Sequence, residues 1–598
     1  MPTLTQRLKH SFPHATLPVF ALAAFSAWCA VCGLFACGNV KFTLISFAGG
    51  VSLGHLTVLT AIMTAVLFWM GSNFPKYLYR VSLLCALFYG CVCCFRSASF
   101  YTAFGFLILL SVLIVHAVRE DRLALDGGTL HPHMTKAIIA VFAVMMATYL
   151  ITAALMRYFA YNSPCYDFGI FSQMFYNMKT TGLPVTTCER EVAMSHFAVH
   201  VSPFYYLLLP FYMIVPRPET LLILQVLGVL SGVIPLYLLA RRFTLSERQT
   251  AILCLLYLGS AALTGGIFYD FHENKFLTAL LLWLFWAIER KKIPFIALFT
   301  VLILGVKEDA ALYIIFIGLW LLLSRPEKKT GAALAVGGTG YFLAVTSWLS
   351  SHGDGVMFNR FSNIIGAKGG IAELVRTALV NPALLLSECM AEDKLIFAAC
   401  VLLPLGLFPF FTKKLSSLIL LCPFVIVNLL SDYAYQHSLN FQYTYGVMAL
   451  LFYLTAANLP NIPNLVSGFR TRRALLCLAL CATALVGTVQ IKNHSAVFKN
   501  FAERKEDRAA IAEVLRTVPD DASVRTASMF AAHLANRSEL YYLTNEVEAD
   551  YVLIDLRPYI SVTSARGYEV EYFERQGYEL ITEVEDVIAV LKKQQPTE

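Results

Sequence analysis

Long apolar runs separated by short polar turns recur through the first 490 residues of this chain. A helix needs roughly 17–25 apolar residues to cross a membrane, and many of these runs approach that length. Composition agrees, because 58% of the residues are hydrophobic and only 14% are charged, whereas soluble proteins carry about 25% charged residues. The sequence therefore predicts an α-helical polytopic membrane protein. It excludes a cytosolic enzyme, a nucleic-acid binder and a disordered chain.

The runs predict about 15 membrane spans, several of them so short that their ends must extend into flanking residues. The predicted spans lie at approximately 16–37, 50–70, 77–95, 100–118, 137–157, 221–240, 249–265, 276–290, 293–306, 309–324, 331–350, 395–412, 415–430, 444–458 and 474–490.

Basic residues set the predicted orientation, because Lys and Arg concentrate in cytoplasmic loops. With the N-terminus in the cytoplasm, the basic clusters between spans all fall on the cytoplasmic side. This agreement requires that the apolar stretch 196–215 does not cross, and Pro203 and Pro210 would interrupt a regular helix there. We therefore expect 196–215 to be a re-entrant or interfacial helix. A true span with an unrecognised partner is the alternative.

The C-terminal part of the chain has a different charge balance. Residues 491–598 hold 19 acidic and 13 basic side chains, whereas residues 1–490 hold 20 acidic and 33 basic ones. The tail is long enough to bury a small core, and its patterning predicts a helix over 507–518, a strand over 549–556, and a helix and strand over 565–582. We expect a small soluble α/β domain.

The predicted organisation has three parts. N-terminal accessory spans occupy 1–130, a transmembrane core with a long outer loop at 158–195 occupies 131–490, and the soluble domain occupies 491–598. The predicted location is the inner (plasma) membrane, with the N-terminus cytoplasmic and the C-terminal domain periplasmic or extracellular. Membrane lipids are the expected surroundings, and no nucleic-acid partner is expected.

Ionisable residues collect in the turns predicted to face outward. They are Asp167 in the long loop, His196 at the start of the interfacial stretch, the Asp270, His272 and Glu273 group, and Lys307 with Glu308. Such residues at membrane depth are costly and indicate a functional site, although a tight turn also needs polar groups to satisfy its backbone. Because separate segments place carboxylates, His and Lys at one membrane face, we expect them to share a site.

Motifs of soluble enzymes do not compete with this interpretation. The chain has no GxxxxGK[ST] or HExxH motif. Cys165 and Cys188 both lie in the outer loop, where an oxidising compartment would permit a disulfide, but the sequence does not establish one. No metal ligands are assigned, and the cofactor is left open, with a divalent cation compatible with the chemistry.

A site at the outer face of a many-span protein suits a lipid-linked substrate. Glycosyl transfer from a polyprenyl-phosphate sugar needs a carboxylate to accept the proton of the attacking hydroxyl. It also needs Lys, His or a metal to offset charge on the departing lipid phosphate. The clustered residue types fit this reaction, with a glycan, lipid or protein as acceptor.

Several of these segments resemble a known family. The run YDFGIFSQMFYNM at 166–178, the run beginning HF at 196, YDFHEN at 269–274 and KEDAALY at 307–313 resemble the prokaryotic polytopic family of unknown function 2079. The ending AHLANR at 532–537, followed by ADYVLID, is similar as well. The resemblance covers roughly 137–557 and leaves out the four N-terminal spans.

That family in turn is similar in layout to GT-C glycosyltransferases, such as the protein mannosyltransferases and aminoarabinose transferases. The resemblance implies a GT-C-like fold, an interfacial helix at 196–215 and Asp167 as the base that activates the acceptor. It implies a hexosyl or pentosyl transferase with substrate contacts from Gln173, His196, Asp270, His272, Glu273, Lys307 and Glu308. The chain departs from the family at Gln442-Tyr443, where the pattern carries His-Tyr, which weakens any role for that turn.

Two other readings stay open. A transporter or flippase of a lipid-linked or small polar substrate would place ionisable residues near mid-membrane on broken helices and show inverted repeats. The sequence shows no clear repeat, and its polar residues cluster at one face. A GT-C-like scaffold without catalytic activity is the third reading, and the sequence identifies neither the sugar nor the acceptor.

Overall fold

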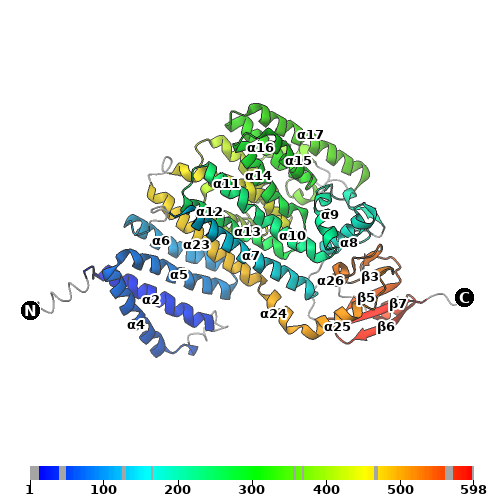
Figure 1. Ribbon diagram of the computed structural model, residues 1–598, viewed down its shortest axis with the longest axis horizontal. Helices are drawn as coiled ribbons and strands as arrows, with labels where there is room; N and C mark the ends of the chain where they lie inside the picture. Colours follow the sequence, from blue (N-terminus) through cyan, green and yellow to red (C-terminus); the bar gives the residue numbers. More distant parts are fainter. Residues whose placement is uncertain are drawn as a thin grey trace, which may run out of the picture.

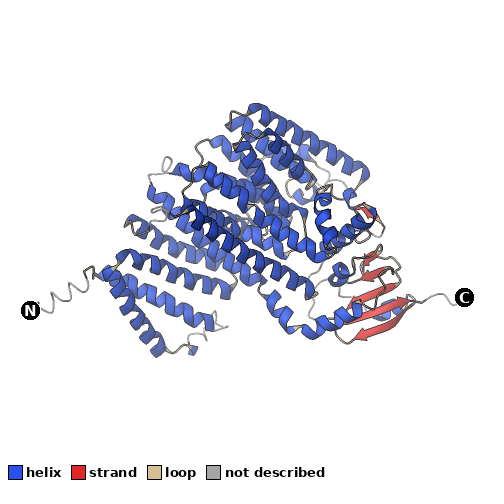
Figure 2. Cartoon of the chain, in the orientation of Figure 1, coloured by secondary structure: helices blue, strands red, loops and turns tan. Residues whose placement is uncertain are grey.

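The computed structural model describes residues 13–38, 49–123, 130–162, 166–190, 192–353, 358–365, 370–462, 469–558 and 570–594. Helices make up most of the body and run side by side, while a small sheet lies at one end of the molecule (Figures 1 and 2). This arrangement confirms a mostly helical membrane protein with a small C-terminal α/β domain.

Nine helices in the described ranges are long and apolar enough to cross a membrane. Each corresponds to one predicted span. They are α2 (Leu17–Gly38), α4 (Leu53–Asn73), α5 (Pro75–Ser97), α6 (Phe100–Arg119), α7 (Pro132–Phe159), α10 with α11 (Pro218–Ser231 and Val233–Arg242), α12 with α13 and η2 (Glu247–Leu258, Ala261–Thr264 and Gly265–Phe268), α17 (Lys328–His352) and α23 with α24 (Phe469–His494 and Ala496–Glu503).

The other six predicted spans fold as shorter or irregular helices. At a rise of about 1.5 Å per residue, a helix of 14 residues extends only about 21 Å, short of a hydrocarbon core of about 30 Å. The structure therefore shows nine candidate spans rather than about 15. The short elements are α14 (Leu277–Glu289), α15 (Ile293–Leu304), α16 (Ala311–Ser324), α20 (Glu392–Leu402), the 3₁₀ and π segments η8 (Leu415–Leu421) and η9 (Phe424–Leu429), and α21 (Tyr445–Asn458).

The stretch 196–215 contains only a short helix. A 3₁₀ turn, η1 (His196–Ala198), precedes α9 (Tyr205–Ile214), which has Pro210 inside it. Ten residues extend about 15 Å, half the thickness of a hydrocarbon core. Large apolar side chains on α9, such as Phe211 and Ile214, are exposed. The helix is therefore too short to span by itself, and an interfacial position for it stays a prediction.

Several other short elements accompany α9 in the fold. Helix α8 (Tyr166–Thr181) lies beside it and is followed by a two-stranded antiparallel ribbon, β1 (Val185–Thr186) with β2 (Met194–Ser195). Two further short helices, α18 (Ile371–Val380) and α19 (Pro382–Cys389), follow α17. None of these elements is long enough to span a membrane by itself.

The C-terminal domain is a mixed five-stranded sheet with the order β4-β3-β5-β7-β6. β3 pairs in parallel with β4 and β5, while β7 pairs antiparallel to β5 and β6. The predicted elements are found, and three strands without a strong sequence signal join them. In chain order the elements are α25 (Lys505–Leu515), β3 (Val524–Thr526), α26 (Ser528–Ala531), β4 (Leu540–Tyr542), β5 (Tyr551–Asp555), α27 (Val570–Glu574), β6 (Tyr578–Val584) and β7 (Ile588–Lys593).

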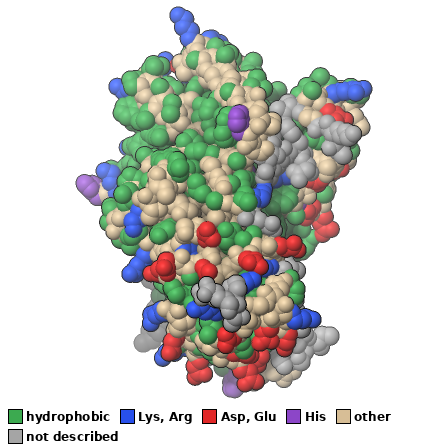
Figure 3. Space-filling model, turned by 90° about the vertical axis from the view of Figure 1, so that its right-hand side faces the viewer, with side chains coloured by type: hydrophobic (Ala, Val, Ile, Leu, Met, Phe, Trp, Pro, Cys, Tyr) green, Lys and Arg blue, Asp and Glu red, His purple; other side chains and the backbone are tan. Residues whose placement is uncertain are grey.

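This domain docks on α8 and the loop that follows it. Its apolar core continues into Tyr161, Ile170 and Cys188 of the membrane body. His533 stacks on Tyr158 with 3.9 Å between ring centroids, and Arg557 donates a 2.7 Å hydrogen bond to the carbonyl of Tyr161. The acidic tail therefore packs on the membrane body. Figure 3 views this end of the molecule, where acidic side chains gather on the lower part and apolar ones cover the upper part.

Basic turns gather at the opposite end of the short helices. Arg325 lies 3.0 Å from Glu289 at the end of α14, Arg242 donates to the carbonyl of Glu289, and Lys414 donates to the carbonyl of Ser324. Separate turns predicted to be cytoplasmic thus meet at one face. Such clustering is typical of a cytoplasmic surface.

Candidate functional site

Asp167 lies in the first turn of α8, and Asp270 fixes that end of the helix. Oδ2 of Asp270 accepts a hydrogen bond from the Phe168 N–H at 3.1 Å, and its Oδ1 lies 3.7 Å from Arg157. A carboxylate at a helix N-terminus satisfies a backbone N–H that has no partner within the helix. Asp270 thereby holds α8, and with it Asp167, against the 269–274 turn.

Only one oxygen of the Asp167 carboxylate accepts hydrogen bonds from described residues. Its Oδ2 accepts hydrogen bonds from the Tyr269 hydroxyl at 2.6 Å and from Nε2 of His272 at 3.1 Å. No described residue donates to Oδ1, and the side chain is 30% exposed. Burial alone would raise the pKa of Asp167, but hydrogen bonds from His272 and Tyr269 and the charge of Lys307 lower it below its usual range. Asp167 is therefore a carboxylate at neutral pH.

A buried network continues from His272. Oε1 of Glu273 lies 3.3 Å from Nζ of Lys307, and its Oε2 accepts a 2.8 Å hydrogen bond from the Tyr205 hydroxyl. His272 Nδ1 lies 3.9 Å from Oε2 of the same carboxylate. Burial would raise the pKa of Glu273, yet the charges of Lys307 and His272 bring it to about 2. Asp167, His272, Glu273 and Lys307 thus form one continuous chain of ionisable groups.

Two further histidines are each paired with a carboxylate. Nδ1 of His196 lies 2.8 Å from Glu189, and Nδ1 of His200 lies 2.8 Å from Glu308. Burial, together with the charge of Lys307, lowers the pKa of His200 despite its pairing with Glu308. His200 is therefore neutral at pH 7, and its Nδ1–H donates to the carboxylate.

These side chains surround a cavity of about 200 Å³. Asp167, His196, His272 and Lys307 all open into it. One wall is aromatic and cationic: the Arg360 guanidinium lies 4.8 Å from the ring centroid of Tyr433. The cavity is lined by Asp167, Ile170, Phe171, Glu189, Arg190, His196, Val199, His200, Tyr269, His272, Lys307, Arg360, Tyr433, Tyr435, Gln442 and Tyr443.

The other predicted contacts lie behind this lining. Asp270, Glu273 and Glu308 hold Asp167, Lys307 and His200 in place, as described above. Gln173 is fully buried and bonds elsewhere: its Oε1 accepts from the N–H of Thr187 at 2.8 Å, and its Nε2 donates to the carbonyl of Ser538 at 3.0 Å. Gln173 therefore joins α8 to the C-terminal domain and does not line the cavity.

Several lining residues had no role in the sequence-based prediction. Arg190 follows Glu189 in the long loop, and Arg360 and Tyr433 come from two other turns of the same face. No local motif marks them, although the loops containing them were predicted to face outward. The Gln442-Tyr443 turn, which the family pattern set aside, also lines the cavity. The amide Oε1 of Gln442 is buried without a hydrogen-bond partner among the described residues.

Four helices begin at this cavity. Asp167 opens α8, and the turns η3 (Glu273–Phe276), η4 (Glu308–Ala310) and η11 (Gln442–Thr444) lead into α14, α16 and α21. Helix N-termini carry partial positive charge, and Arg190, Lys307 and Arg360 add full charges to the same space. Together they favour an anion in the cavity, while Asp167 supplies a separate acceptor for a hydroxyl.

Metal and disulfide chemistry receive no support from the described part of the chain. It contains no group of three or more His, Cys, Asp and Glu side chains arranged to hold a metal ion. Cys188 is buried against the C-terminal domain, and Cys165 lies outside the described residues.

Comparison with known families agrees with the resemblance predicted from the sequence. Residues 157–580 match the family described as "Predicted membrane protein (DUF2079)". The chain belongs to this family. The match includes Asp167, the 269–274 turn, Lys307 and most of the C-terminal domain, and it excludes the N-terminal helices α2, α4, α5 and α6. No curated protein matches this chain.

Proposed function

We propose that this protein is a membrane glycosyltransferase of GT-C-like design. It transfers a sugar from a polyprenyl-phosphate-linked donor to a hydroxyl of a glycan, lipid or protein acceptor. The observation that carries the proposal is Asp167, a carboxylate with one oxygen held by Tyr269 and His272 and the other without a donor among the described residues. It opens into a cavity that also contains Lys307 and Arg360.

The cavity contains separate partners for the two ends of the reaction. Lys307, Arg190 and Arg360 suit the phosphate of the donor, because a charged donor held away from bulk water stabilises developing negative charge strongly. Tyr433, Tyr435 and Tyr443 form an aromatic wall beside them, which suits the apolar face of a sugar ring. Oδ1 of Asp167 is left to accept a hydrogen bond from the acceptor.

In the proposed reaction the acceptor oxygen attacks C1 of the sugar, and the bond between C1 and the phosphate oxygen breaks. The electron pair of that bond passes to the phosphate, where the cationic side chains stabilise it. The hydroxyl proton passes to Oδ1 of Asp167. The lowered pKa of Asp167 makes it a weak base toward a free alcohol, so we expect the proton to move late, after bond formation to C1 has made the hydroxyl acidic.

We also propose that the cavity faces the periplasm or cell exterior. The basic turns around Arg242, Arg325 and Lys414 gather at the far ends of the helices that begin at the cavity, and a basic face is typically cytoplasmic. A reporter enzyme that is active only in the periplasm, fused after residue 598, should then be active. Activity of a cytoplasm-only reporter at the same position would reverse the assignment.

The transferase proposal is tested by complementing a deletion strain. Wild-type protein should restore a surface glycan or glycolipid that is missing from the deletion strain, whereas Asp167→Asn should not restore it and the polyprenyl-linked donor should accumulate. Asp586→Asn is the matched control, because it makes the same chemical change in the exposed β6–β7 turn at a positive φ that Asn tolerates. Protein levels are compared by immunoblot.

The outcomes separate the competing functions. Full restoration by Asp167→Asn would reject Asp167 as the reactive carboxylate and favour a scaffold without catalytic activity. A transporter would leave the sugar on its polyprenyl carrier and change only the side of the membrane on which that lipid appears. Polar residues gathered at one end of the helices favour the transferase over a mid-membrane transport site.

A further inference from the structure

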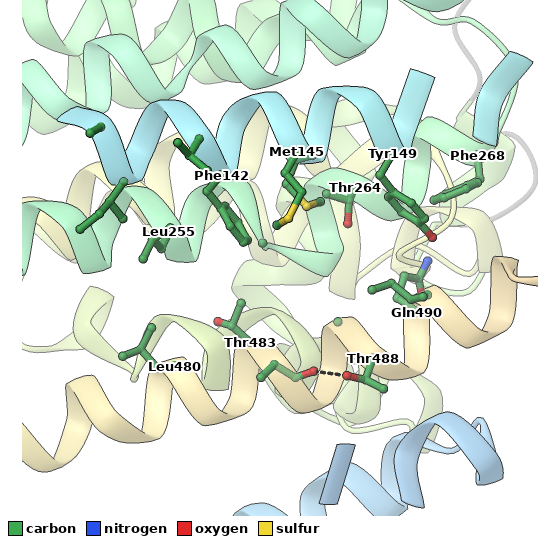
Figure 4. Close-up of a pocket in the computed structure, with 18 residues that line it drawn as sticks. Phe142, Met145, Tyr149, Leu255, Thr264, Phe268, Leu480, Thr483, Thr488 and Gln490 are labelled. Carbon is green, nitrogen blue, oxygen red and sulfur yellow. Dashed lines mark hydrogen bonds between the residues drawn. The ribbon is translucent and has the colours of Figure 1, made fainter. Parts of the chain in front are cut away.

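A groove within the membrane-spanning helices lies apart from the cavity at Asp167. It has a volume of about 830 Å³ and lies between α7, the α12–α13 segment and α23. Figure 4 shows Phe142 and Met145 of α7 projecting toward Leu480 and Thr483 of α23 across this space. Its walls are almost entirely apolar, as a site for a hydrocarbon chain requires.

Small residues create the depth of the groove. Gly259, Ala484 and Gly487 line it, and larger side chains at these positions would occupy its space. Gly259 also lets α12 approach α23 closely, because an added Cβ would lie 3.1 Å from the side chain of Thr483. Along α7 the groove extends from Ala137 to Tyr149, a rise of about 18 Å. The groove is therefore long, as an extended hydrocarbon chain would require.

One end of the groove reaches the face that carries the candidate site. Tyr149, Thr264 and Gln490 provide polar atoms there, and Phe268 forms part of the wall. Tyr269, the next residue, donates a hydrogen bond to Asp167. A lipid whose chain lies in the groove would consequently have its head group next to the segment that carries Tyr269 and His272.

A second groove on the other flank of α7 provides a contrast. It has a similar volume, about 700 Å³, and is lined by apolar residues of α7, α10 and α11 between Lys136 and Ala147 and between Leu227 and Tyr237. It stops short of the site face, because it contains no residue of the 264–274 segment. Two grooves of like character thus differ in whether they lead to the site.

We propose that the groove between α7, α12–α13 and α23 binds the polyprenyl chain of the lipid-linked donor. This inference rests on the proposed function for the identity of the lipid. Apolar contact along the groove holds the chain, the small residues leave room for it, and the polar end directs the phosphate toward the site face. Ordinary two-chain phospholipids are the competing occupant. The end of the groove at Phe268, next to the segment that carries Tyr269, favours the lipid that the candidate site would use.

The test measures lipid binding without requiring transfer. Full-length protein in nanodiscs of phosphatidylcholine is labelled with a photoreactive polyprenyl phosphate, and unlabelled polyprenyl phosphate or phosphatidylglycerol is added as competitor. Ala484→Phe fills the proposed groove, while Ala143→Phe makes the same change in the second groove. Withdrawing roughly two methylene groups from apolar contact lowers affinity about tenfold, so Ala484→Phe should weaken labelling at least that much and Ala143→Phe should not.

Each result has a defined meaning. Equal labelling of both variants and wild type, or competition by phosphatidylglycerol as effective as by polyprenyl phosphate, would overturn the inference. Asp167→Asn should retain wild-type labelling, because it leaves the groove intact. Specific labelling combined with full cellular activity of Asp167→Asn would reject the transferase while leaving the lipid site in place, so the two failures are distinguishable.

Discussion

Separating Glu273 from Lys307 should destabilise the protein much more than separating a surface ion pair. Oε1 of Glu273 and Nζ of Lys307 lie 3.3 Å apart, and the two side chains are 0% and 8% exposed. Removing one partner of a buried pair leaves an uncompensated charge and costs about 3–5 kcal/mol. We therefore expect Glu273→Gln and Lys307→Met each to lower the free energy of unfolding by about that amount.

The double variant Glu273→Gln/Lys307→Met should be less damaging than the sum of the single variants, because it leaves neither charge alone. The assay is equilibrium unfolding in mixed detergent and SDS. The control cycle uses Lys291→Met and Glu327→Gln, a pair 2.9 Å apart in which Lys291 is 66% exposed. An exposed pair contributes about 0–1 kcal/mol, so this cycle should show little coupling.

The coupling between Glu273 and Lys307 should also be constant from about pH 6 to pH 8. The pKa of Glu273 is lowered to about 2, so its stabilising contribution is present above its unfolded value of about 4.3 and disappears as pH falls through 2. The pKa of Lys307 is raised, so its contribution is complete below its unfolded value of about 10.4. If Glu273→Gln and Glu327→Gln lowered the free energy of unfolding equally, the strong contribution expected of the buried ion pair would be refuted.

Three further perturbations test other parts of the structure. Burial raises the pKa of Asp309 to about 6, so the ionised carboxylate destabilises the folded protein above that pH. Asp309→Asn should therefore raise the melting temperature more at pH 8 than at pH 5. An equal change at both pH values would contradict this. A Cβ on Gly169 would lie 2.4 Å from the Tyr542 hydroxyl oxygen, so Gly169→Ala should speed proteolytic release of the C-terminal domain, and an unchanged rate would show that the interface adapts. Gln173→Ala leaves the Ser538 carbonyl and the buried Thr187 N–H without this partner. This loss should cost about 1–3 kcal/mol in thermal unfolding, whereas retained stability would show that water replaces the amide.

Much of the candidate site was predictable because ionisable residues, which are energetically unfavourable beside a membrane, are easily recognised in an apolar sequence. A carboxylate such as Asp167 or a lysine such as Lys307 beside a membrane needs a partner or a function. The prediction that the turns carrying these residues lie at one membrane face came from the order of the predicted spans and the positions of the basic loops. Arg360 and Tyr433 were not predictable, since Arg and Tyr in a polar loop carry no comparable signal, and only their approach to Lys307 and Tyr443 gives them a place in the cavity.

Gln173 is a residue whose role depends on contacts that the sequence does not reveal. The family resemblance implied a substrate contact for this residue, but its partners at Arg537 and Ser538 lie more than 360 residues away. No local pattern reveals such a pairing. The C-terminal domain therefore determines what that side chain does, and this interface became visible only in three dimensions.

The sequence by itself determined the membrane character of the chain, the nine long helices and the small α/β domain. Each of these depends on hydrophobicity or periodicity within a window of about 20 residues, which the chain carries locally. The sequence left open whether six shorter apolar runs cross the membrane, and in the structure they form short or irregular helices. It also brought together Asp167 and His272, which are 105 residues apart. Such contacts depend on how helix ends pack, and a buried charge finds its partner through packing, whatever its distance along the chain.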